Sequence, residues 1–204
     1  MGAYERDPHE HYVEPPWTSA RLFAHEAFPG RVIDPACGWG RIVRNGTASG
    51  VDMLGFDLVD RELPPGEPAF RRGIRFAQDF MEPTWWPGGG VDCIVSNPPF
   101  KLCNVRDMRR AGRKTFAALA LERATRKVAL LMPSTWHQGD ETSRWLQTTP
   151  LLRVWFLTPR PSMPPGRYLA EGQKPGNGKE DYAWYVWLHG YDGQPVMRWL
   201  RRDA

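Results

Sequence analysis

The chain has 204 residues, of which 41% are hydrophobic and 25% are charged, enough for one domain with a full core. A net charge of +4 is mildly basic and is compatible with a polyanionic partner. Three cysteines without CxxC spacing exclude a zinc pattern and favour a reduced, cytoplasmic protein. No apolar stretch reaches the ~18–20 residues that span a bilayer, and no apolar run follows a basic N-terminus, so we expect no membrane segment and no secretory signal.

The chain opens with a polar, Pro-rich segment, residues 1–16. We expect His9 and His11 in it to be solvated rather than to bind a metal, and we expect no metal site elsewhere. Thr18 or Ser19 is then a suitable N-cap for the first helix.

Apolar periodicity predicts the remaining elements in chain order. The expected helices are residues 18–28, a segment after the Gly-rich turn at 32–40, residues 115–124 and residues 139–147. The expected strands lie within residues 30–43, 50–60, 74–82, 91–100, 127–133, 152–158 and 182–188, with 195–200 as a candidate to pair beside the last two.

Strands that alternate with helices predict an α/β fold, in which a mostly parallel sheet carries helices on both faces. The last strands come without intervening helices, so we expect the final pair to be antiparallel. We find no internal repeat and no second domain, and expect residues 1–204 to form a single domain. Residues 159–181, rich in Pro, Gly and Lys, form a loop long enough to be functional or disordered. Most of the ten tryptophans should pack in the core or at its rim.

The turn "VIDPACGWG" places Asp34 at a strand end, before Gly38 and Gly40. It lacks the third glycine of the dinucleotide fingerprint and the Gly-Lys-Ser/Thr of a P-loop, so its ligand need not be a phosphate. A cofactor with an amino acid end and a nucleoside end would suit this acid and the backbone of the turn.

Two further strand ends supply acids for the nucleoside end. Asp57 is placed to accept hydrogen bonds from both ribose hydroxyls, with Leu58 packing on a base. Asp79 could accept from an exocyclic amine, and the ring of Phe80 could cover the base.

"VDCIVSNPPF" ends a buried strand with a rigid polar segment. Pro98 and Pro99 have no N–H for a sheet ladder, and Asn97 is held extended because it precedes a proline. The Asn97 amide is therefore fixed at the strand end, beside the ring of Phe100.

Together, "DPACGWG", "GFD", "QDF" and "NPPF" resemble class I methyltransferases that use S-adenosylmethionine (SAM), and more narrowly the amino-methyltransferases of the adenine-N6 DNA type. "HYVEPPW" is similar to the Tyr-x-x-Pro segment that helps to hold the methionine end of SAM in that group. "RPSMPPG" and "DYAWYVW" look like small phage- and prophage-encoded methyltransferases. The fold that this implies is a Rossmann-like, mostly parallel seven-stranded sheet with an antiparallel last strand.

The resemblance implies roles for the matching positions, with residues 1–17 as the cofactor-entry segment. The implied SAM-binding residues are Tyr12, Pro15, Asp34, Ala36, Cys37, Gly38, Gly40, Asp57, Leu58, Asp79, Phe80 and Asn97. The implied catalytic residues are Asn97, Pro98, Pro99 and Phe100. The Asn97 side-chain oxygen and the Pro98 carbonyl would accept the two hydrogens of an adenine amine, and Phe100 would stack on a flipped base. The sequence has Asn where the "DPPY" version has an acid, and Phe where that version has Tyr.

Residues 101–127 hold nine basic residues against two acidic ones and follow directly on the "NPPF" motif. We expect a phosphate-facing patch here, made by Lys101, Arg106, Arg109, Arg110, Arg113 and Lys114. Residues 101–114 and 159–181 are the candidate target-recognition loops.

The leading interpretation is a SAM-dependent adenine-N6 methyltransferase acting on DNA, as a monomer or homodimer in a bacterial host. The alternatives are methylation of an RNA adenine or guanine amine, methylation of a protein glutamine amide, and a SAM-fold protein that binds nucleic acid without turnover.

Overall fold

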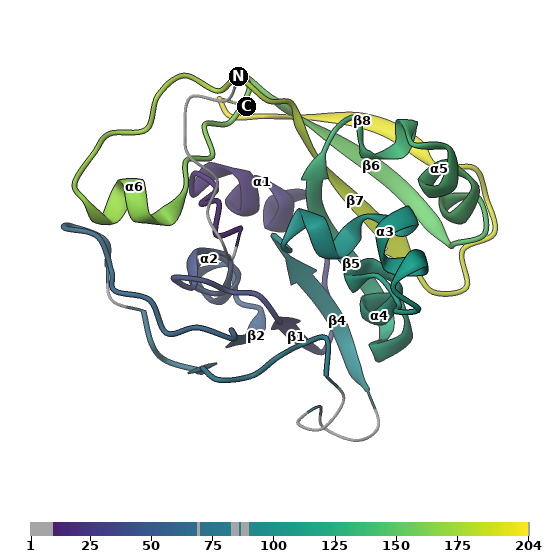
Figure 1. The fold of residues 1–204 in the computed structure, drawn as a ribbon, viewed down its shortest axis with the longest axis horizontal. Coiled ribbons are helices and arrows are strands. Elements are labelled where there is room, and N and C mark those ends of the chain that lie inside the picture. The colour runs from purple at the N-terminus through teal and green to yellow at the C-terminus, as the bar shows by residue number, and fades with distance from the viewer. Residues whose placement is uncertain (1–9, 69, 83–85, 87–89, 204) are drawn as a thin grey trace.

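The computed structural model describes residues 10–68, 70–82, 86 and 90–203. They form one sheet in the order β3-β2-β1-β4-β5-β7-β6-β8 (Figure 1). The strands are β1 (Arg31–Asp34), β2 (Asp52–Phe56), β3 (Ile74–Arg75), β4 (Val91–Ser96), β5 (Ala124–Pro133), β6 (Leu151–Thr158), β7 (Tyr182–Leu188) and β8 (Val196–Arg201).

The sheet is mostly parallel, as the sequence predicts. β1 to β5 pair in parallel, and β7 runs antiparallel to both β5 and β6. The sheet has eight strands where the sequence predicted seven. The additional strand is β8, residues 196–201, which pairs with β6 in parallel. β7 already has a partner on each side, so the last strand takes the free edge beside β6.

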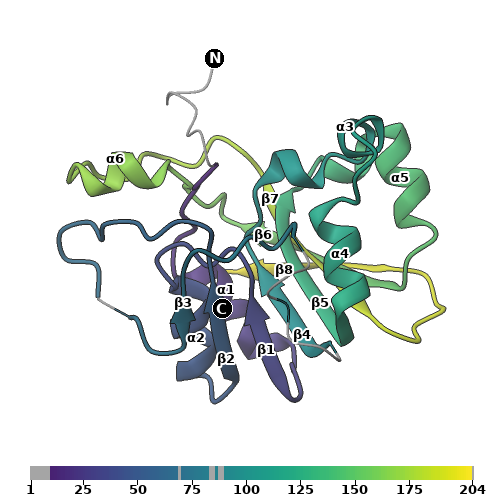
Figure 2. The same ribbon diagram turned by 60° about the horizontal axis from the view of Figure 1, so that its bottom comes forward.

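Helices cover both faces of the sheet (Figures 1 and 2). α1 (Trp17–His25) and α2 (Arg41–Ala48) pack one core, and α4 (Phe116–Arg123) and α5 (Asp140–Leu146) pack the other. The shorter helices are η2 (Phe100–Cys103), α3 (Val105–Arg110), η3 (Trp136–Gln138) and α6 (Gly166–Ala170). None of the described helices has the length and apolar character that a membrane span requires.

Some local expectations need correction. α1 is capped by Pro16 rather than Thr18 or Ser19, and the Thr18 hydroxyl instead donates to the Pro15 carbonyl (2.9 Å) inside the first turn. The 159–181 segment contains α6, so a short helix does separate β6 from β7. The N-cap of α4 is Thr115, whose side chain accepts from the Ala118 N–H.

The central strands create the crevice in which a ligand of such a fold binds. β1 lies between β2 and β4, so the chain connections leave in opposite directions on its two sides. β4 is buried along nearly its whole length, as a strand covered on both faces must be. Asp34 ends β1 and Asn97 follows β4, which places both at the same edge of the sheet.

Candidate active site

A cavity of about 250 Å³ opens at this edge. Its walls come from the N-terminal segment, the Gly-rich turn, the ends of β2 and β4, and the segment around Asp79. Five acidic and three basic residues line it: Glu10, Glu14, Asp34, Asp57 and Asp79, with Arg41, Arg61 and Lys101. The excess of acid favours a cationic ligand.

Residues 10–14, here called the N-terminal cover, line one side of the cavity and are held by the segment that precedes α6. The Val13 N–H donates to the Pro164 carbonyl (2.9 Å), and the Gly166 N–H donates to the His11 carbonyl (2.7 Å). Figure 2 shows α6 beside this segment. In the second candidate recognition loop, residues 161–166 are mostly buried, whereas residues 159–160 and 170–181 are largely exposed.

His11 is not a solvated leader residue, as we expected from the sequence. Its ring is half-buried and meets Trp39 edge-on, with the ring centroids 4.8 Å apart. His9 lies outside the described residues. Among the described residues no group of His, Cys, Asp and Glu is placed to hold a metal ion.

The Gly-rich turn is braced by bonds within the protein. The N–H of Ala36 donates to Asp34 Oδ1 (3.2 Å), that of Cys37 to the Phe56 carbonyl (2.9 Å), and that of Gly38 to Asp57 Oδ2 (2.7 Å). Gly38 has φ +52°, and a Cβ there would lie 2.7 Å from His11 Nε2. The turn therefore offers a ligand close approach to the backbone more than free N–H donors.

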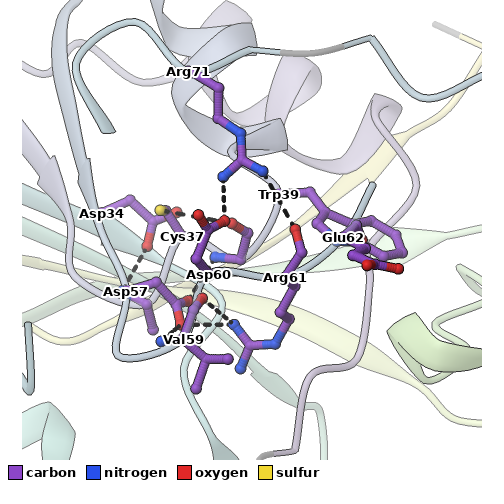
Figure 3. A network of polar contacts seen from close by, with 11 residues as sticks. Asp34, Cys37, Trp39, Asp57, Val59, Asp60, Arg61, Glu62 and Arg71 are labelled. Atoms are coloured by element: carbon purple, nitrogen blue, oxygen red, sulfur yellow. Dashed lines mark hydrogen bonds and ion pairs between the residues drawn. The ribbon is translucent and has the colours of Figure 1, made fainter. Parts of the chain in front are cut away.

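Asp57 is engaged on both oxygens. Oδ1 accepts from the Val59 N–H (2.9 Å) and from Arg61 Nη1 (2.6 Å), and Oδ2 accepts from Gly38 (Figure 3). Its predicted ribose contact therefore has a competitor in Arg61, which the sequence analysis did not single out.

Asp34 is the most deeply buried acid of the site, 1% exposed. Burial raises the pKa of its carboxyl well above the ordinary value, against the hydrogen bonds from Ser96 Oγ (2.7 Å) and the Ala36 N–H, which lower it. The nearby carboxylates of Glu14 and Asp57 raise it further. A cation bound here would favour the ionised carboxylate.

Of the residues predicted to contact the nucleoside end of the ligand, Leu58 and Asp79 lie as expected, but Phe80 does not. Leu58 lines the cavity with an apolar side chain that is 53% exposed, so it is free to pack on a ligand. Asp79 also lines it, and its Oδ1 accepts from the Met81 N–H (2.8 Å). Phe80 is 3% exposed, because its ring packs on Phe116 (centroids 4.4 Å apart) and under the guanidinium of Arg123. It forms part of the cavity wall rather than an open stacking face.

Asn97 reaches the cavity with its side-chain nitrogen fully engaged. Nδ2 donates to the Tyr12 carbonyl (2.8 Å) and to Glu14 Oε2 (2.9 Å). Glu14, which the sequence analysis did not single out, is 6% exposed, and burial raises the pKa of its carboxyl. The Asn97 oxygen is left to face a ligand.

The rest of the motif supports this arrangement. Pro99 lines the cavity, but its carbonyl accepts from the Leu102 N–H (3.0 Å). Pro98 is buried, and Phe100 is half-buried with its ring parallel to that of Tyr12, the centroids being 6.4 Å apart. Of the predicted site residues, Pro15, Gly40, Pro98 and Phe100 do not line the cavity itself.

The six predicted phosphate-binding residues are all exposed, and they divide by their ion pairs. Arg109 pairs with Glu141 (3.1 Å), Arg113 with Glu82 (3.7 Å), and Lys114 with Glu122. Within the described ranges, no carboxylate pairs with the other three, which are Lys101, Arg106 and Arg110. The patch is therefore less basic than its sequence indicates.

Neither a family model nor a curated protein sequence matches the chain. Solved structures do match. With a proposed class I SAM-dependent methyltransferase from Listeria monocytogenes the TM-score is 0.60 and the identity 11%, over 98% of this chain and 68% of that one. For the M protein of the type I restriction enzyme EcoKI, the TM-score is 0.58 and the identity 12%, over 94% of this chain and 48% of that one. For a proposed RNA methyltransferase from Pyrococcus horikoshii, the TM-score is 0.51 and the identity 15%, over 85% of this chain and 81% of that one.

These likenesses define the fold as that of class I SAM-dependent methyltransferases. The chain spans about half of the EcoKI M protein.

Proposed function

We propose that this protein transfers a methyl group from SAM to the exocyclic N6 amine of adenine in DNA. The observation that carries the proposal is the fixed Asn97 amide: its nitrogen is held by Tyr12 and Glu14, and it lines the same cavity as Asp34 and Asp57.

Three features of this chain support SAM as the ligand of the cavity. The Gly-rich turn lines it at Gly38, the carboxyl groups favour a cation, and exposed Leu58 offers an apolar face for a base. Asp34 and the Gly-rich turn would hold the methionine end, and Asp57 would hold the ribose. When bound, SAM supplies an electrophilic methyl group on its sulfonium.

Asn97 would prepare the target amine for attack. An adenine amine is a poor nucleophile because its lone pair is delocalised into the ring. The Asn97 oxygen and the Pro98 carbonyl would each accept one of its hydrogens, which favours a pyramidal nitrogen with the lone pair directed at the methyl group. Fixed dipoles of this kind need no rearrangement during the reaction. The excess proton on the methylated nitrogen would pass to water.

The three cysteines of the described residues do not support a covalent route. Burial raises the pKa of the Cys37 and Cys103 thiols well above the ordinary value and that of Cys93 to about 11, so none is a thiolate near neutral pH. Direct attack by the amine is the route that these residues support.

A nucleic acid substrate is supported by the unpaired cations Lys101, Arg106 and Arg110, which follow the motif on η2 and α3. DNA is favoured because the EcoKI M protein is a modification component of a restriction enzyme. RNA is the second candidate, favoured by the likeness to the proposed RNA methyltransferase.

The test is methyl transfer from labelled SAM to duplex DNA, single-stranded DNA and total RNA, followed by mass spectrometry of the nucleosides. We expect N6-methyladenine in DNA with the wild-type protein and with Asn45→Ala, and none with Asn97→Ala. Asn45 is a matched control, because it bonds the Pro16 carbonyl (2.7 Å) at the α1–α2 junction and does not line the cavity.

Label in RNA alone would replace DNA by RNA as the substrate. If the protein binds SAM but labels neither DNA nor RNA, nucleic acid methylation is contradicted. The protein would then methylate a protein amide, or bind nucleic acid without turnover.

A further inference from the structure

The side-chain amide of Asn97 has two chemically different ends, and only one orientation serves the proposed reaction. If the group turned by 180° about its last bond, the nitrogen would face the target amine, and two donors would meet. Something must therefore fix which end faces the cavity. Rigidity of the backbone from the two prolines does not do this, because it leaves the amide free to rotate.

The neighbours of Asn97 determine the orientation. Nδ2 meets two acceptors, the Tyr12 carbonyl (2.8 Å) and Glu14 Oε2 (2.9 Å). Both come from the N-terminal cover, 85 and 83 residues away in the chain. A carbonyl and a carboxylate can only accept from a nitrogen here, so a flipped amide would place its oxygen against both of them.

We propose that Glu14 is a positioning residue, which holds the Asn97 amide with its oxygen toward the target amine. The role of Glu14 in the reaction rests on the proposed function, whereas its contact with Asn97 is independent of it. The carboxylate strengthens the bond by its charge, while the Tyr12 carbonyl occupies the second hydrogen.

Glu14 is itself held firmly enough for this role. Its side chain is 6% exposed, and its backbone carbonyl accepts from Arg41 Nη1 (2.9 Å) at the start of α2. Arg41 is in turn paired with Glu67 (2.5 Å). The next residue back, Val13, is bonded to Pro164. The cover is thus tied to α2 at Glu14 itself and to the segment before α6 at the neighbouring Val13.

The same geometry explains why residue 97 is Asn. An aspartate would turn one oxygen toward the Tyr12 carbonyl and the Glu14 carboxylate, and three acceptors would meet without a hydrogen between them. The amide is therefore the form of this motif that matches a Glu at position 14.

The first test observes the contact without any reaction. The chain has four asparagines, Asn45, Asn97, Asn104 and Asn177. Protein labelled with ¹⁵N only in asparagine therefore gives few side-chain amide signals, and Asn97→Ala identifies the one in question. We expect its hydrogens to exchange at least roughly 10-fold more slowly than those of exposed Asn177, in the wild type and in Glu14→Gln but not in Glu14→Leu.

The second test separates positioning from cofactor binding. Glu14→Gln keeps an acceptor oxygen, whereas Glu14→Leu has similar bulk and none. We expect Glu14→Leu to lower kcat by about 10- to 100-fold with the Kd for SAM changed by less than about 3-fold, and Glu14→Gln to restore most of kcat. If Glu14→Leu does not fold, Glu14→Ala takes its place.

Two results would overturn the proposal. One is a Glu14→Leu protein with wild-type kcat and a protected Asn97 amide. The other is a Glu14→Gln protein that loses SAM binding, which would make Glu14 a ligand of the cofactor. Failure of the proposed function gives a different result, because the amide would then be protected in a wild-type protein that methylates nothing.

Discussion

Arg61 Nη1 lies 2.6 Å from Asp57 Oδ1, so the carboxylate at the end of β2 already holds a cation where a ribose is expected (Figure 3). Three donors occupy the roughly four lone-pair positions of this carboxylate. Two ribose hydroxyls need two positions, so Arg61 must give way for both to bind.

Replacing Arg61 should therefore strengthen cofactor binding. We expect Arg61→Ala to lower the Kd for SAM by about 3- to 10-fold, measured by isothermal titration calorimetry. Arg71→Ala is the control, since Arg71 pairs with the neighbouring Asp60 (2.6 Å) and should leave the Kd unchanged. Weaker binding by Arg61→Ala would mean that the guanidinium supports the cofactor directly.

The Gly38→Ala substitution should damage the site more than its backbone strain explains. Its positive φ alone costs roughly 1–2 kcal/mol with a Cβ present. In addition, the new methyl group would lie 2.7 Å from His11 Nε2 and displace the cover. We expect SAM binding to fall more than roughly 10-fold.

Gly50→Ala is the matched control for this substitution, because Gly50 has φ +81° and a Cβ there would meet nothing within 4 Å. Thermal melts should show a loss of stability in both variants, larger in Gly38→Ala because of the clash with His11, and only Gly38→Ala should lose the cofactor. Equal SAM binding in the two would show that the cover does not contribute to the site.

Asp34 should make the cofactor-free protein less stable as pH rises. Because burial raises the pKa of its carboxyl, the folded state holds a proton that the unfolded state releases above its ordinary pKa of about 3.8. The stability from this group is therefore complete below that pH and is lost as pH rises toward the higher pKa of the folded state.

Asp34→Asn removes this titration and keeps the acceptor oxygen for Ser96 and Ala36, both of which bond Oδ1. Its melting temperature should exceed that of the wild type by a margin that grows from pH 5 to pH 8, while SAM binding is lost. Asp52→Asn, at an exposed ion pair with Arg31 (3.0 Å), should show no growing margin. A constant difference between Asp34→Asn and wild type across this range would refute the account of Asp34.

Arg106 and Arg110 should contribute most of the binding to DNA on α3, because their charges are not neutralised by carboxylates among the described residues. We expect the double variant Arg106→Ala/Arg110→Ala to reduce the slope of log K against log salt by about 2. Fluorescence anisotropy with labelled duplex DNA at several salt concentrations measures this slope.

A control that keeps the net charge of the wild type is available at the contact between α3 and α5. Arg109→Ala with Glu141→Gln removes an ion pair of 3.1 Å without changing the sum of charges, and should leave the slope nearly unchanged. Equal losses in the two double variants would mean that the patch acts through its shape rather than through its free cations.

The features that the sequence predicts well are local to the central strands. Asp34, Asp57 and Asn97 each end an apolar run, and parallel strands carry their ends to one edge, so their convergence follows from the pattern. The antiparallel direction of β7 follows because no full-length helix lies between β6 and β7 to carry the chain back for a parallel strand. β8 was only a candidate because it is an edge strand, and five of its six residues are exposed, so it has no clear apolar face.

The features that sequence reasoning missed depend on distant contacts. Glu14 meets Asn97 across 83 residues, and Phe80 is covered by Phe116 of α4, which follows β4 in the chain. The charge of residues 101–114 is reduced by acids from three separate segments, Glu82, Glu122 and Glu141. A linear pattern contains no signal for such pairs, since each depends on how the elements pack.

The most direct measurement of the central claim is the content of N6-methyladenine in genomic DNA from a bacterial strain that lacks adenine methylation of its own, after expression of this chain. This assay presents every sequence context at once, so it does not depend on the recognised site. The account predicts N6-methyladenine in cells that express the wild-type protein and none in cells that express Asn97→Ala at equal level. Unmethylated adenine in both, with folded protein that binds SAM, would contradict it.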